Sequence, residues 1–83
     1  MAEKEIGKVS EYFAKPVVAG ISLTAPLNQG DRIHILGHTT DLEMAVDSMQ
    51  LDNAVIEKAK KGQAVGIKVA DRVRVGDTVY KVT

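Results

Sequence analysis

Hydrophobic and polar positions alternate along several short stretches of this chain. A period of two is typical of a strand with one buried face, and it recurs in residues 17–24, 32–36, 65–69 and 78–82. Residues 6–13 also fit an extended strand, with Gly7 as the position of a bulge. The apolar residues predicted to point into the core are Val17, Ala19, Ile21, Ile33, Ile35, Val46, Val65, Ile67 and Val69.

Two stretches depart from simple alternation. Within residues 44–51 the apolar positions change from even to odd numbers, which predicts one strand with a β-bulge near Asp47–Ser48. Residues 53–62, NAVIEKAKKG, fit a short helix ending at the last glycine, and they fit a strand followed by a glycine turn equally well. Residues 24–31 and 70–77 contain turn-forming residues and predict connections without strands.

One short pattern occurs twice. Residues 27–35, LNQGDRIHI, and 73–80, VRVGDTVY, each place Gly-Asp just before a strand. Glycine tolerates a positive φ and an aspartate side chain can cap a turn, so Gly30 and Gly76 are predicted at tight turns with φ above zero. About six short strands separated by such turns predict an all-β fold: a small, closed, antiparallel barrel of six to seven strands, forming a single domain over residues 1–83.

Composition narrows the class of protein. Eighty-three residues allow one domain with a modest core. The chain has no cysteine and no apolar leader, which predicts a cytoplasmic protein in a reducing compartment. Its longest apolar run, VVAGI, is too short to span a membrane, so no membrane partner is expected.

Charge is balanced overall but unevenly distributed. Residues 31–57 carry one cation against six carboxylates, whereas residues 58–83 carry seven cations against two carboxylates. If residues 61–68 and 72–78 form adjacent strands, their cations share one rim that could neutralise phosphates of RNA. The alternatives are that the two oppositely charged segments pair with each other, or that the cations form a solvated face. The predicted nucleic-acid-binding residues are Lys58, Lys60, Lys61, Lys68, Arg72 and Arg74.

The sequence gives little support for a metal, nucleotide or catalytic site. His34 and His38 are four residues apart, and in a strand that spacing separates them by roughly 13 Å, so two surface histidines are predicted rather than a metal site. Met44 and Met49 are expected to fill the core. The sequence contains no P-loop and no nucleophile-elbow pattern, and we expect no nucleotide, no cofactor and no catalytic residue.

A set of short motifs runs through nearly the whole chain: Gly7–Val9, Gly30–Asp31, Gly37, Val46–Met49, Ala59, Gly62, Val65–Ile67 and Gly76–Asp77. In this order they resemble the β-barrel second domain of translational GTPases such as elongation factor Tu. The chain is similar above all to small prokaryotic elongation factor-like proteins. Barrels of this type also occur as C-terminal modules of prokaryotic collagenase-like peptidases.

The resemblance implies a non-enzymatic binding module that contacts tRNA, another RNA or a translation-related ribonucleoprotein. The alternative is a protein–protein docking barrel of the kind appended to the collagenase-like peptidases. The arrangement of the six cations separates these hypotheses. One continuous basic face favours RNA, whereas scattered or paired cations favour docking to a protein.

Overall fold

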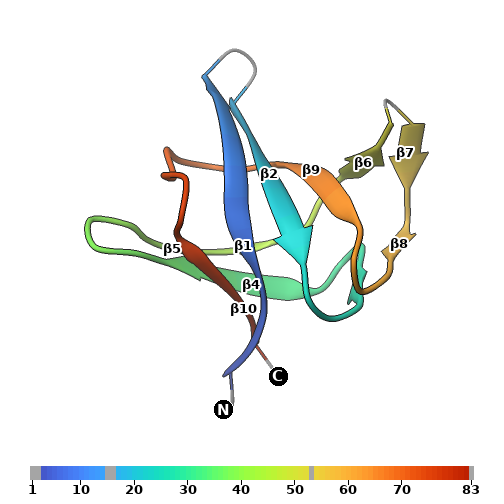
Figure 1. Cartoon of the computed structure of the whole chain (residues 1–83), viewed down its shortest axis with the longest axis horizontal. Helices are drawn as coiled ribbons and strands as arrows, with labels where there is room; N and C mark the ends of the chain where they lie inside the picture. Colours follow the sequence, from blue (N-terminus) through green and yellow to red (C-terminus); the bar gives the residue numbers. More distant parts are fainter. Residues whose placement is uncertain (1–2, 15–16, 53, 83) are drawn as a thin grey trace.

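The computed structural model describes residues 3–14, 17–52 and 54–82 (Figure 1). These residues form β-strands joined by turns and irregular connections, and they include no apolar helix of membrane-spanning length. The strands are β1 (Glu3–Ala14), β2 (Val17–Leu23), β3 (Leu27–Asn28), β4 (Arg32–Leu36), β5 (Asp41–Ala45), β6 (Met49–Leu51), β7 (Ala54–Ile56), β8 (Lys58–Ala59), β9 (Ala64–Lys68) and β10 (Thr78–Val82).

Eight of the strands form one antiparallel sheet, in the order β5-β4-β10-β1-β2-β9-β6-β7, and β3 pairs with β8 in a second, two-stranded sheet. The all-β, antiparallel prediction is therefore confirmed. The large sheet ends at β5 and at β7, and within the described residues no ladder joins these ends. The continuous hydrogen-bonded closure expected of a barrel is not found.

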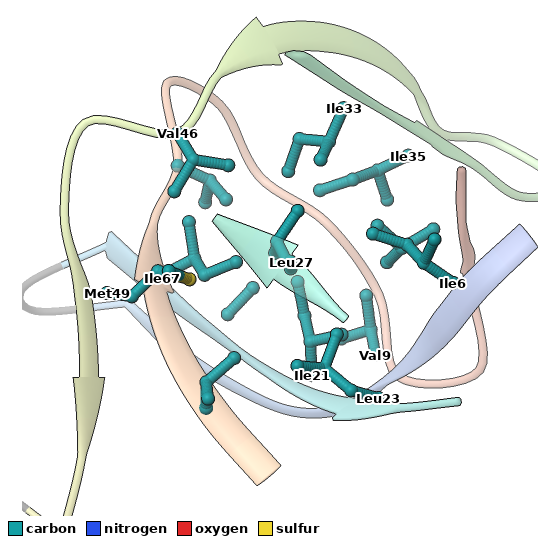
Figure 2. Packing of buried hydrophobic residues seen from close by; sticks show 14 of the residues in the cluster. Ile6, Val9, Ile21, Leu23, Leu27, Ile33, Ile35, Val46, Met49 and Ile67 are labelled. Atoms are coloured by element: carbon teal, nitrogen blue, oxygen red, sulfur yellow. The ribbon is translucent and has the colours of Figure 1, made fainter. Parts of the chain in front are cut away.

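The large sheet curls around a hydrophobic core (Figure 2). Side chains from β1, β2, β4, β6 and β9 point toward a common centre, where Leu27 of β3 lies among them. Leu27 is fully buried, although it belongs to the predicted connection 24–31. The two-residue strand β3 thus supplies the centre of the core.

The predicted core residues are confirmed with one exception. Val17, at the start of β2, is half-buried and packs against the core rather than within it. Met49 is fully buried and Met44 packs against the core from its margin. The buried hydrophobic residues are Ile6, Val9, Ala19, Ile21, Leu23, Leu27, Ile33, Ile35, Val46, Met49, Ala59, Val65, Ile67, Val69, Val73 and Val79.

The repeated Gly-Asp pattern marks two equivalent turns. Gly30 and Gly76 have φ values of 92° and 96°. In each turn the aspartate that follows donates its backbone N–H to the carbonyl three residues earlier, at 3.1 Å, and its carboxylate accepts the N–H of that same earlier residue. This is a type II turn, which requires φ above zero at its third residue. The predicted turn glycines are confirmed.

A third copy of this turn has glutamine in place of aspartate. Gly62 has φ of 90°, the N–H of Gln63 bonds to the carbonyl of Lys60, and the N–H of Lys60 bonds to Gln63 Oε1 at 2.8 Å. The segment 53–62 is therefore two short strands followed by a glycine turn, not a helix; Asn53 lies outside the described residues.

The predicted strand across residues 44–51 is two strands. β5 pairs with β4, whereas β6 pairs with β9 and β7, and the three residues between them form no ladder. The change of parity therefore marks a corner at which the chain passes from one end of the sheet to the other, rather than a bulge. The bulge predicted at Gly7 is confirmed by a register shift in β1 between Glu5 and Gly7.

Candidate functional site

The six predicted RNA-binding residues are all exposed, but they do not share one rim. Lys58, Lys60 and Lys61 lie on β8 and in the turn before β9, whereas Lys68 ends β9 and the two arginines follow it. The ends of β9 are roughly 13 Å apart. The condition for a shared rim is not met either, because residues 72–77 form no strand and β10, which begins at Thr78, lies between β1 and β4 rather than beside β9.

The oppositely charged segments are linked by little direct pairing. Among the described residues, one ion pair joins them: Lys81 Nζ lies 3.3 Å from Asp31 Oδ2. Arg32 instead pairs with Glu43 inside the acidic segment. The basic side chains at both ends of β9 therefore remain on the surface, in two separate groups.

His34, on the outer face of the sheet, lies between two carboxylates. Its Nδ1 lies 2.7 Å from Glu3 Oε2 on β1 and its Nε2 lies 2.5 Å from Asp41 Oδ1 on β5. Carboxylates only accept hydrogen bonds, so this arrangement favours the doubly protonated, cationic imidazole, in which both ring nitrogens donate. The hydrogen bond to Asp41, followed by that to Glu3, raises the pKa of His34 above its ordinary 6.5.

The two predicted surface histidines therefore differ in their surroundings. The His34 side chain is 16% exposed and both of its nitrogens are occupied, whereas His38 is exposed in the bend after β4. Across the described ranges no cluster of three potential metal-ligating side chains is found. His34 therefore joins three elements, β1, β4 and β5, electrostatically.

A second feature lies on the outer face of the other half of the sheet. The ladders align one residue from each of five strands in a single row: Glu11, Gly20, Gly66, Gln50 and Val55, from β1, β2, β9, β6 and β7. Paired residues in adjacent strands point to the same face. The second and third positions of this row are glycines, so backbone rather than side chain forms the floor of a shallow trough there.

Apolar and cationic side chains border this floor. In the next row, Phe13, Val18 and Lys68 face outward beside the two glycines. A depression of about 170 Å³ is lined by Val18, Ser48, Gln50, Gly66 and Lys68. We call this feature the glycine trough: Gly66 lines the depression, and Gly20 lies beside it in the β2–β9 ladder.

A second depression continues from the glycine trough. Ser48 and Lys68 line both, and the second one, of about 330 Å³, extends past Met44 and Asp47. Phe13 and Val55 on either side of the trough are 51% and 69% exposed. Exposed apolar side chains beside a concave surface are typical of an interaction face. The sequence pattern did not reveal this feature. Gly20 and Gly66 both fall at positions of predicted strands where an outward-facing side chain is expected.

Comparisons with known proteins overturn the translation-factor resemblance. An uncharacterized protease of Methanocaldococcus jannaschii is 47% identical over 77 residues, which cover 92% of this chain and 19% of that protein. A collagenase of Porphyromonas gingivalis is 35% identical over 78 residues, 92% of this chain and 22% of that protein. The chain thus spans about a fifth of the length of the curated relatives it matches. No family model matches it.

The fold matches that of a C-terminal domain whose structure has been solved. The C-terminal domain of a Geobacillus thermoleovorans protein assigned to the U32 peptidases superposes with a TM-score of 0.89, covering 96% of this chain and 93% of that domain at 16% identity. At that identity the likeness shows the fold alone. The relatives are accordingly named protease, collagenase and peptidase, and the elongation factor-like, translational interpretation is wrong. The RNA contact predicted for the six cations stays a prediction.

Proposed function

We propose that this chain is a non-catalytic docking module of a collagenase-like peptidase, and that it binds the peptidase body. The observation that carries the proposal is the pair of relatives, named protease and collagenase, that match 92% of this chain with about a fifth of their own length. In this proposal the remaining four-fifths holds the catalytic residues.

The side chains of the described residues agree with a binding role. Both nitrogens of His34 face carboxylates, so in this geometry neither ring nitrogen is open to the proton of a nucleophile. The exposed cations fall into two groups rather than one phosphate-binding face, which is the arrangement expected for docking to a protein. Exposed apolar side chains beside the glycine trough supply a surface of suitable chemistry.

We further infer that the domain acts as a rigid, barrel-like scaffold without a continuous ladder. The backbone N–H of Gly30 donates to Val46 just beyond β5, and the N–H of Val46 donates to Asp31, at 2.9 and 2.8 Å. These bonds tie the end of β5 to the turn that precedes β4. Together with Leu27 at the centre, they would hold the curled sheet in shape.

A chimera tests the docking proposal. The 77 matching residues of the Methanocaldococcus jannaschii protease are exchanged for this chain, and the acetylation rate of each lysine is compared with that in the isolated chain. Docking to the body should slow the labelling of at least one lysine several-fold. Equal rates at every lysine would mean that the module does not dock, and the proposal would fail.

A further inference from the structure

We propose that the glycine trough is a docking groove for an extended segment of the peptidase body, which places a carboxylate side chain against Lys68. The inference rests on the proposed docking function and assigns it to one face. Three properties of the trough support it: the glycine floor, the exposed side chains along its sides, and the cation Lys68.

The fold does not require a glycine at position 66. Gly66 lies inside β9 and does not have a positive φ, and a Cβ added there would meet only Val18 Cγ1, at 3.4 Å, an ordinary van der Waals contact. Glycine within a strand lowers stability relative to other residues, and often marks a place where a ligand or another backbone approaches closely. Keeping the trough floor open is therefore the role that remains for Gly66.

Gly20 differs, because its environment is already tight. A Cβ there would come within 3.2 Å of Glu11 Cβ, next to the register shift in β1 between Val9 and Glu11. Gly20 is thus explained by packing as well as by the trough. A substitution at Gly66 can therefore change binding without disturbing the fold, whereas a substitution at Gly20 would be expected to affect both.

The shape of the trough suits an extended chain. Its floor is backbone from two neighbouring strands, and its sides carry Val18 and, further out, Phe13 and Val55. On the Val55 side the sheet ends at β7, the strand at the right of Figure 1. An extended segment of β-branched or small residues fits a shallow groove with a backbone floor and mixed apolar and polar sides better than a helix of about 10 Å diameter does.

Lys68 sets the charge of the segment. It lines both depressions, and among the described residues its Nζ has no ion-pair partner. Two carboxylates also border this surface: Glu11 lies beside Gly20 in the floor row, and Asp47 lines the second depression together with Lys68. A segment crossing the trough meets the ammonium group of Lys68, for which a Glu or Asp side chain is the complementary partner.

The small size of the trough favours a covalently joined partner. Two depressions of about 170 and 330 Å³ have room for only a few side chains, whereas a standard protein interface buries about 1,600 Å², so affinity for a free segment should be low. In the relatives the module is part of one chain with the peptidase body, and a tethered segment has a high effective concentration. Weak contacts then suffice for docking, which is why we assign the segment to the body.

Capped pentapeptides provide the probe for the isolated chain. The peptides are acetyl-Thr-Val-Glu-Val-Thr-amide and two relatives in which Gln or Lys replaces Glu, and the readout is amide NMR shifts. The Glu peptide should shift Val18, Gly20, Gly66 and Lys68 with a millimolar dissociation constant. The Gln peptide should bind about two- to fivefold more weakly, the gain expected from one exposed ion pair. Absent shifts, or shifts centred on Lys58 to Lys61, would overturn the proposal.

Substitutions separate the groove from the fold. Gly66→Ala and Gly66→Thr should weaken binding stepwise while the melting temperature stays equal or rises, and Lys68→Glu should abolish the preference for the Glu peptide. Ala45→Thr, a similar change on the exposed outer side of β5, and Lys58→Glu, an identical charge reversal on β8, are the matched controls. Equal binding by Gly66→Thr and wild type would refute the groove.

The chimera distinguishes failure of the groove from failure of the module. If the groove is correct, acetylation slows at Lys68 and not at Lys58. If the body instead protects Lys58, Lys60 and Lys61, docking stands but the groove assignment is wrong. Protection at no lysine contradicts both.

Discussion

Gly37 lies against the buried carboxylate of Asp77, so closely that a Cβ at position 37 would overlap it. Gly37 follows β4, and Asp77 precedes β10, the strand that pairs with β4. Asp77 is 5% exposed and its Oδ2 accepts the N–H of Arg74 at 2.8 Å. The glycine therefore makes room for the side chain that closes the neighbouring turn.

Gly37→Ala should destabilise the domain by about 2 kcal/mol or more, because the methyl group displaces a buried carboxylate from its hydrogen bond. Urea unfolding of the single and double variants with Asp77→Ala measures the effect. Removing the carboxylate removes the overlap, so Gly37→Ala should cost much less in the Asp77→Ala background. Additive costs would show that the two residues do not interact.

The three turn glycines should respond differently from Gly37. A Cβ at Gly30, Gly62 or Gly76 meets nothing within 4 Å, but each has φ near +90°. Substitution by alanine should therefore cost about 1 kcal/mol from backbone strain alone, and no second-site change should relieve it. Gly66→Ala is the control, with an expected gain of about 0.5 kcal/mol, since its strand conformation suits alanine. A neutral result at Gly30 and Gly76 would contradict the turn assignment.

Leu27→Ala should be the most damaging of the simple truncations in the core. Leu27 is fully buried at the centre of the curled sheet (Figure 2). Leucine-to-alanine changes at such sites cost about 2–5 kcal/mol, a large part of the stability of a small domain. Val55→Ala, at a side chain that is 69% exposed, should stay within about 0.5 kcal/mol. Comparable costs in urea unfolding would place Leu27 outside the core.

These contrasts show where sequence periodicity is informative. Alternation located β2, β4 and β9 because each runs for at least five residues with one face buried, and β10 because its five residues alternate around the buried Val79. β3 has two residues, too few to show a period, so the central position of Leu27 could not be predicted. The corner after β5 changes the parity of the pattern as a bulge does, and sequence cannot separate the two.

The site was harder to predict than the fold, because it depends on which strands are neighbours. Lys61 and Lys68 are near in sequence, yet β9 carries them to opposite ends of a strand. Gly20 and Gly66 are far apart in sequence but lie opposite each other in the β2–β9 ladder. Neither the separation of the cations nor the pairing of the glycines is visible without the strand order.

His34 should make stability depend on pH above its ordinary pKa. The hydrogen bonds with Asp41 and Glu3 raise the pKa of His34 from 6.5, so the folded state binds the proton more tightly than the unfolded state. The stabilisation is complete below pH 6.5, provided both carboxylates are ionised. It is lost as pH rises through the raised pKa. Its size should be about 1 kcal/mol or less, because the Asp41 side chain is 76% exposed.

Urea unfolding across that pH range, with NMR titration of the imidazole, measures this dependence. His34→Gln should remove the decrease in stability above pH 6.5, and the packing of the hydrophobic core should stay intact. Asp41→Asn should lower the pKa of His34 more than Glu3→Gln does, because the hydrogen bond to Asp41 is the largest cause of the shift. If the pKa of His34 in the wild type lies at or below 6.5, the imidazole is not held as a cation. The link between β1, β4 and β5 would then be a pair of ordinary surface contacts.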